Sequence, residues 1–125
     1  MNKVAFNKRL KIRREVLGAR YVDAAIKNAD DFNMPVQEWV TEHCWNEIWN
    51  RPGLDRRTRS IINHVMITAL NRPHELKLNV LGDINNGLTK DDIQDVFLET
   101  AIYNGVPATI DSFKGTKEVL KDKGI

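Results

Sequence analysis

The chain has 125 residues, 42% of them hydrophobic and 29% charged, which suits a single domain spanning residues 1–125. Its 19 basic and 17 acidic residues give a formal net charge of only +2, without the basic excess of a nucleic-acid-binding protein. Cys44 is the only cysteine, which excludes an intrachain disulfide and a CxxC redox pair. No apolar run is long enough for a signal peptide or a membrane span, so we expect a cytoplasmic protein without membrane contact.

Apolar residues in the first half of the chain recur every three or four positions, as in helices with one buried face. One such pattern covers residues 6–17 and stops at Gly18, and another covers residues 22–29. A third begins at Pro35, a residue suited to the first position of a helix, and continues until Arg51-Pro52-Gly53 stops it. The first half therefore predicts three helices.

The second half of the chain predicts four more helical segments. Residues 55–70 carry an apolar stripe wide enough for a central buried helix, which includes Ile61, Ile62, Val65, Met66, Ala69 and Leu70. Further patterns follow over residues 73–84, ending at Asn86-Gly87, and from Thr89, a helix-capping residue, to Gly105. A last pattern starts at Pro107. Because no segment alternates with period two, we predict an all-α bundle of about six to seven helices.

Three tryptophans lie on the predicted third helix. Trp45 and Trp49 are four residues apart and share a face, whereas Trp39 is turned away. Three tryptophans exceed what one short helix usually buries in a small monomer, so we expect the protein to form a homo-oligomer.

Familiar catalytic and cofactor-binding patterns are absent from the sequence. There is no GxSxG, GxxxxGK[ST] or GxGxxG segment. His43 and Glu47 stand four residues apart on one helix, but neither His64 nor His74 adds a ligand at a metal-binding spacing. We therefore predict no bound metal and interpret His43 as a helical histidine bonded to a neighbour.

Two basic segments allow more than one interpretation. The cations of residues 3–14 suit a membrane surface or a nucleic acid, although a solvated face is the simpler interpretation. Arg56, Arg57 and Arg59 lie in the first turn of a predicted helix, where each opposes the helix dipole by about 0.3 to 1 kcal/mol. Together with Arg51 they predict a site for an anionic ligand. The alternative is ion pairing with acids of a neighbouring helix or subunit.

Six segments carry a resemblance to a known family. They are RREVLG at 13–18, WNEIWNRPGL at 45–54, RRTRS at 56–60, NRPHELKL at 71–78, NNGLT at 85–89 and AIYNGVPA at 101–108. In this order and spacing the chain resembles the carboxymuconolactone decarboxylases. The resemblance implies an alkylhydroperoxidase-like helical fold, ring-shaped oligomers (hexamer or trimer), no metal or organic cofactor, and a place in protocatechuate (β-ketoadipate) catabolism.

The resemblance also implies a reaction. The family substrate is a lactone with two carboxylates, and the electrons left by departing carbon dioxide delocalise into its conjugated carbonyl, so no cofactor is needed as an electron sink. The protein must orient the dianion, stabilise charge at the carbonyl oxygen and protonate carbon. For these tasks we assign Arg51, Arg56 and Arg59 to carboxylate binding, and Asn79 and Ser60 to hydrogen bonding.

Proton transfer is assigned to Glu75 or His43. We prefer Glu75 because it matches a family segment and lies four residues before Asn79, on the same face of a helix. The alternative role for Glu75 is an exposed ion-pair partner of Arg72 or Lys77.

Several positions depart from the family pattern. Asn79 stands where family members usually have a histidine, and Tyr21 and Asn104 replace a frequent histidine and cysteine. The two cysteines and the histidine of the related thiol peroxidases correspond here to Arg72, Glu75 and Asn79, so that peroxidase chemistry is excluded. Asparagine donates a hydrogen bond to an oxyanion but has no proton to lose at neutral pH.

The sequence therefore predicts a cofactor-free carboxy-lyase acting on 4-carboxymuconolactone or a related small anionic lactone. One alternative is a non-catalytic helical oligomer of the same family that binds a small anion or a partner protein. Another is an accessory protein that acts on membranes or nucleic acids through its basic first helix, which steep salt dependence of binding would reveal.

Overall fold

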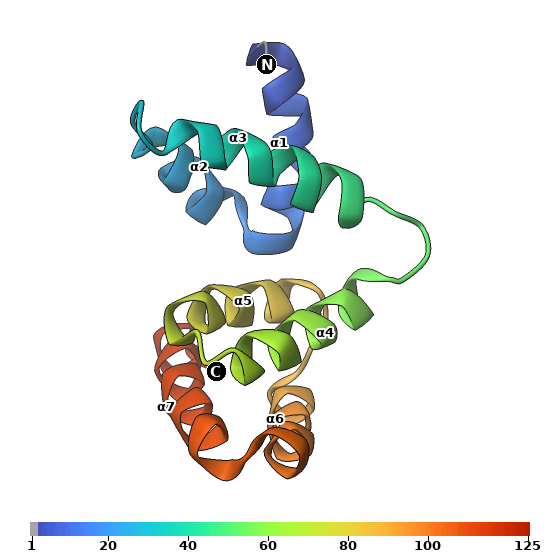
Figure 1. Ribbon diagram of the computed structural model, residues 1–125, viewed down its shortest axis with the longest axis vertical. Helices are drawn as coiled ribbons and strands as arrows, with labels where there is room; N and C mark the ends of the chain where they lie inside the picture. Colours follow the sequence, from blue (N-terminus) through green and yellow to red (C-terminus); the bar gives the residue numbers. More distant parts are fainter. Residues whose placement is uncertain (1–2) are drawn as a thin grey trace. The chain divides into compact units, whose positions relative to one another are not determined.

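The computed structural model describes residues 3–125, and all regular structure in this range is helical (Figure 1). The elements are α1 (Lys3–Leu17), α2 (Ala19–Lys27), α3 (Met34–Val40), the π-helix η1 (Thr41–Ile48), α4 (Arg56–Ala69), α5 (Pro73–Asn85), α6 (Lys90–Asn104) and α7 (Val106–Asp122). The predicted all-α class is confirmed. Within this range no helix combines the length and the apolar character needed to cross a bilayer.

Contacts divide the chain into two compact units, the first ending at Arg56 and the second spanning Arg57–Ile125. Each unit has its own hydrophobic core, and each is described separately below. The single domain over residues 1–125 stays a prediction.

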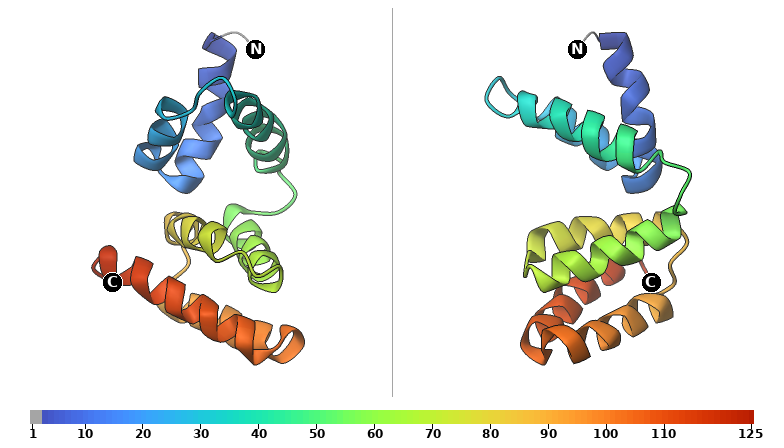
Figure 2. Two further views of the ribbon diagram at one scale, coloured as in Figure 1. Left: turned by 60° about the vertical axis from the view of Figure 1, so that its left-hand side comes forward. Right: turned by 45° about the vertical axis from the view of Figure 1, so that its right-hand side comes forward.

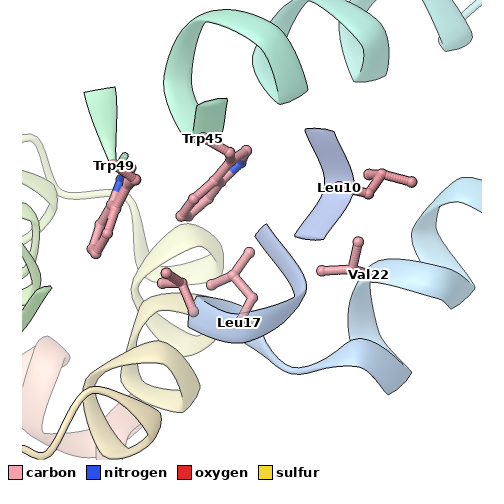
Figure 3. Close-up of a cluster of buried hydrophobic side chains, with 6 residues drawn as sticks. Leu10, Leu17, Val22, Trp45 and Trp49 are labelled. Carbon is pink, nitrogen blue, oxygen red and sulfur yellow. The ribbon is translucent and has the colours of Figure 1, made fainter. Parts of the chain in front are cut away.

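The first unit packs α1 against α2 and η1. Its buried core consists of Leu10, Val16, Leu17, Val22, Trp45 and Trp49 (Figure 3). The rings of Trp45 and Trp49 lie with their centroids 5.2 Å apart, whereas Trp39 is 63% exposed. The predicted division of the three tryptophans between two faces is therefore confirmed.

The third predicted helix changes its winding midway. Its first part, α3, is α-helical, and η1 continues directly from it with π-helical winding. The Trp49 amide correspondingly donates to the Cys44 carbonyl oxygen, five residues back, at 3.0 Å. The apolar spacing predicted the helix but not this wider turn, because side-chain periodicity does not separate α from π winding over eight residues.

The second unit contains α4 to α7, with α7 packed against both α5 and α6. Its core consists of Leu76, Val80, Leu88, Ile93, Phe97 and Leu120. The two views of Figure 2 show α4 and α5 lying side by side. Helix α5 ends as predicted at Asn86-Gly87, where Gly87 has φ of 93°, a conformation that residues with a Cβ rarely adopt.

Helix α6 begins with a reciprocal pair of hydrogen bonds. The Thr89 hydroxyl oxygen accepts from the Asp92 amide at 3.1 Å, and the Asp92 carboxylate accepts from the Thr89 amide at 2.9 Å. This capping box satisfies two amides that a helix N-terminus leaves unpaired, and it confirms Thr89 as the predicted cap.

Helix α4 buries a polar face, which corrects the sequence analysis. Its buried residues are Ser60, His64 and Thr68, whereas Ile62 and Met66 of the predicted core stripe are 40% and 49% exposed. The apolar residues of α4 extend around much of its circumference, so their pattern did not identify the buried side. The interpretation of α4 as a helix buried through that stripe is therefore wrong for most of the stripe, whereas Ile61 packs against the core of the second unit.

Candidate active site

Two polar pairs connect α4 to α5. Ser60 and His64 are one turn apart on α4, and Asp83 and Asn86 are about one turn apart near the end of α5. The Asn86 amide nitrogen donates to the Ser60 hydroxyl oxygen at 2.8 Å, and His64 Nδ1 lies 2.6 Å from Asp83 Oδ2. The buried face of α4 is thus tied to α5 by side-chain hydrogen bonds.

The His64–Asp83 pair is closed off from solvent. The His64 and Asp83 side chains are 0% and 1% exposed, and the Phe97 ring packs on the imidazole with a centroid distance of 4.4 Å. Within residues 3–125, His64 Nε2 has no hydrogen-bond partner. A buried polar atom left unpaired costs about 1 to 3 kcal/mol, so its presence indicates a use beyond packing.

The protonation of the pair follows from its burial. Burial raises the pKa of Asp83, and the hydrogen bond with His64 partly opposes that rise. Low dielectric surroundings favour an electrically neutral pair, either imidazolium with carboxylate or imidazole with carboxylic acid. In both forms Nδ1 is engaged with Asp83, so Nε2 carries a hydrogen. The neutral pair therefore offers an N–H donor at Nε2.

Helix α5 places the predicted residues Glu75 and Asn79 on the same face as this pair. Residues 75, 79, 83 and 86 recur every three or four positions, which aligns them along one side of the helix. The Asn79 side-chain amide donates to the Glu75 backbone carbonyl at 2.9 Å, and the Glu75 side chain is exposed. One amide hydrogen of Asn79 is therefore used within the helix. The catalytic roles of Glu75 and Asn79 stay predictions.

His43 lies in the first unit, on η1. Its Nδ1 is 3.1 Å from a carboxylate oxygen of Glu47, the imidazole is 48% exposed, and its ring centroid is 5.4 Å from that of Trp39. This confirms the interpretation of His43 as a helical histidine bonded to a neighbour. Its role in proton transfer stays a prediction.

Two arginines of the predicted anion site have carboxylate partners within their own units. Arg56 donates to Glu15 at 2.6 Å, and Arg57 lies 3.1 Å from Asp92. The hydrogen bond from the Thr89 amide and the one from Arg57 lower the pKa of Asp92. In this structure Arg56 and Arg57 therefore form ion pairs, as the alternative interpretation of this segment predicted.

The remaining predicted binding residues have different surroundings. Arg51 is exposed in the loop after η1, Arg59 is half-buried on α4, and Ser60 is buried and bonded to Asn86. Carboxylate binding by Arg51, Arg56 and Arg59 and hydrogen bonding by Ser60 stay predictions.

Arg13 is a buried cation that the sequence analysis did not single out. It is 6% exposed, its guanidinium donates to Gln37 at 2.8 Å and to Thr41 at 3.3 Å, and its Nε has no partner within residues 3–125. Burial lowers the pKa of Arg13, and nearby Tyr21 and Cys44 oppose this. The only available signal was its position among the apolar residues of the first helical stripe. A buried guanidinium held by neutral groups suits an anion.

His64 and Asp83 were also missed as a pair. From its spacing His64 is only a candidate metal ligand, and Asp83 lies inside an apolar run without a recognisable motif. Within the described residues, no group of three His, Cys, Asp or Glu side chains is placed to hold a metal ion. What the arrangement supplies is a hydrogen-bonded imidazole able to give or accept a proton.

Comparison with known proteins gives the same family as the six sequence segments that carry the resemblance. The family model described as the carboxymuconolactone decarboxylase family matches residues 35–118, which include α4, α5 and α6. The chain belongs to this family. With the helical structure, membership confirms the predicted alkylhydroperoxidase-like fold.

Two relatives of this family member are named as decarboxylases. The 4-carboxymuconolactone decarboxylase of Acinetobacter baylyi is 39% identical over 116 residues, covering 93% of this chain and 87% of the relative. The nitrosuccinic acid decarboxylase of Metarhizium robertsii is 39% identical over 117 residues, covering 94% and 82%. The two relatives have equal identity to this chain but act on different acids.

Proposed function

We propose that this family member is a carboxy-lyase that needs no cofactor and acts on 4-carboxymuconolactone or a related small anionic lactone in aromatic catabolism. Its similarity to two decarboxylases supports the reaction class. The observation that carries the proposal is the buried His64–Asp83 pair, because it leaves one imidazole nitrogen, Nε2, unpaired in a protein that has asparagine at position 79.

The substrates named for the two relatives share one chemical feature. Each carries two carboxylates, one of them on a carbon from which electrons delocalise into an acceptor, a conjugated lactone carbonyl or a nitro group. Breaking the bond to that carboxylate releases carbon dioxide and leaves the electron pair in the acceptor as an enolate or a nitronate. The carbon then takes up one proton, which balances the reaction and requires a proton donor.

In the proposed mechanism His64 supplies this proton. Asp83 fixes the imidazole and stabilises its charged form, and solvent returns the proton after each turnover. Because the imidazole is fully buried, transfer to a substrate requires the packing around Phe97 to open or a water molecule to intervene. On α5, Glu75 lies about two turns before Asp83, and Asn79 lies about one turn before it. The side-chain amide of Asn79 would donate to the developing oxyanion.

The substrate's charge requires cationic groups. Arg51, Arg56 and Arg59 remain the candidates proposed from the sequence. Arg56 would have to release the Glu15 carboxylate in order to bind a carboxylate of the substrate.

The alternative function is a non-catalytic oligomer that binds a small anion or a partner protein. Asn79 favours it, because the amide replaces an ionisable imidazole and donates to the backbone of its own helix. A turnover assay distinguishes the two functions.

The test uses purified protein with 4-carboxymuconolactone, followed by the loss of the unsaturated lactone's absorbance, and with nitrosuccinate, followed by carbon dioxide release. We expect catalytic turnover of the lactone that survives treatment with a chelator. Binding of either acid without turnover would support the alternative. Turnover of nitrosuccinate alone would keep the reaction class and replace the proposed substrate.

A further inference from the structure

The second unit contains a cavity between α6 and α7. Its volume is about 720 Å³, within the roughly 300 to 1,000 Å³ typical of pockets for organic ligands. Apolar side chains of both helices line it, including Ile93, Phe97, Phe113 and Leu120. The rings of Phe97 and Phe113 are tilted against each other with a centroid distance of 4.7 Å. Phe97 is 0% exposed, so the half-buried ring of Phe113 is the aromatic surface that favours offset or edge-to-face contact with a planar ring.

The charged residues that line the cavity are mostly basic. Lys90, Lys114, Lys117 and Lys121 contribute four ammonium groups, against one acidic side chain, Asp91. Glu118, beside Lys114, pairs instead with Lys77 at 2.7 Å. Within residues 3–125 none of the four lining lysines forms an ion pair. The lining therefore carries an excess of positive charge, which attracts anions.

Thr116 provides an independent observation. It lines the cavity, is 3% exposed, and its hydroxyl has no partner within the described residues. Other buried threonines of this unit behave differently: Thr68, Thr100 and Thr109 each donate to the carbonyl four residues earlier, at 2.8, 2.7 and 3.2 Å. Thr116 is thus a buried hydroxyl beside the cavity that its own helix does not satisfy, as expected where a ligand or a bound water supplies the partner.

We propose that the α6–α7 cavity binds an amphipathic organic anion, an aromatic body of about two rings that bears a carboxylate. The rings pack on the half-buried Phe113, whose own ring lies against the buried Phe97, and the carboxylate is held by the lysines through their flexible stems. This site is additional to the one in the proposed function, and its volume exceeds what a single lactone ring needs. Phe97 contacts both the cavity and His64, so occupancy of the cavity changes the packing around the imidazole.

Calorimetric titration with naphthalene-2-carboxylate tests the proposal, with naphthalene-2-methanol as the uncharged analogue. We expect one saturable site per chain and about tenfold weaker binding of the alcohol, because charge-assisted hydrogen bonds to the carboxylate are lost. The His64 imidazole resonances should shift during the titration. Absence of saturable binding, or equal affinity for the two compounds, would overturn the proposal.

Matched variants identify the cavity as the place of binding. The double variant Lys114→Gln, Lys117→Gln should weaken naphthalene-2-carboxylate about tenfold or more, whereas Lys123→Gln, an exposed lysine outside the lining, should not. Phe113→Leu should weaken both compounds, with helicity checked by circular dichroism. Equal losses in the Lys123→Gln control and the double variant would overturn the assignment. Binding by a protein without turnover would support the cavity and refute only the proposed function.

Discussion

At the residue scale, His64 and Asp83 depend on each other for their chemistry. A carboxyl group 1% exposed would be costly as an isolated anion, and a buried imidazole would be costly as an isolated cation. Paired at 2.6 Å, they share a proton in surroundings that exclude water. The same burial that favours proton sharing within the pair also links its protonation to the stability of the fold.

That link gives a pH dependence whose sign is fixed by Asp83. Burial raises its pKa in the folded state above the ordinary 3.8, so its favourable contribution is fully present below 3.8 and is lost as the pH rises through the raised value. Urea denaturation measured from pH 3.8 upward tests this. The free energy of unfolding of wild type should fall relative to that of Asp83→Asn as the pH increases. The exposed control Asp95→Asn should not change with pH in this way. A pH-independent difference between wild type and Asp83→Asn would contradict the assignment.

Position 79 offers a second prediction at this scale. Asn79→His restores the residue usual in the family, one turn before Asp83 on α5. We expect it to raise decarboxylation, with the larger gain, about a hundredfold, in a His64→Gln background that lacks the native imidazole. Initial decarboxylation rates are compared for wild type, Asn79→His, His64→Gln and the double variant. Stability is measured in parallel, because the larger ring costs about 1 to 3 kcal/mol if the space is tight. No gain in either stable background would mean that an imidazole at 79 cannot serve as the acid.

The residues differ in how far the sequence predicted them. Glu75 and Asn79 share a helix, so their spacing alone placed them on one face, and the structure bears this out. His64 and Asp83 lie on different helices, and their contact depends on how α4 packs against α5. The burial of Arg13 could not be predicted for a similar reason, because it depends on tertiary packing.

At the element scale, local signals predicted helix ends better than buried faces. Glycines and Thr89 act through their own backbone or the next turn, so Gly18, Gly87 and Thr89 mark the predicted boundaries. The buried side of α4 depends instead on its neighbours. There, hydrogen bonds to Asp83 and Asn86 allow His64 and Ser60 to be buried while apolar residues of the same helix remain exposed.

The capping box of α6 gives the prediction at this scale. Thr89→Ala removes the hydroxyl that accepts from the Asp92 amide and should lower the free energy of unfolding by about 1 kcal/mol. Thr89→Ser keeps the hydroxyl and should lose much less. Chemical denaturation of both variants measures the difference, and equal losses would show that the hydroxyl is not what stabilises this helix end.

At the scale of the whole molecule, exposed apolar residues gather around the junction of α6 and α7. They are Leu98 at 54% exposed, Ile102 at 79%, Tyr103 at 85%, Val106 at 57% and Ile110 at 60%. Exposed apolar residues concentrated in one part of a chain commonly belong to an interface. With the oligomers implied by the family resemblance, this surface supports the proposal that copies of the chain associate through it.

Sedimentation equilibrium tests this association. We expect a mass three or six times the 14.4 kDa of the chain, and dissociation when a charge is placed on the surface by Ile102→Glu. Lys8→Glu, an exposed change on α1, serves as the control and should leave the mass unchanged. A wild-type protein that sediments at 14.4 kDa would refute the proposed assembly.

We propose above that this chain decarboxylates a small carboxylate substrate with His64 as its proton donor. The most direct measurement is kcat on 4-carboxymuconolactone for wild type, His64→Gln and the exposed-histidine control His74→Gln. We predict a loss of about a hundredfold or more in folded His64→Gln and no change in His74→Gln. Wild-type turnover retained by a folded His64→Gln protein would contradict the account.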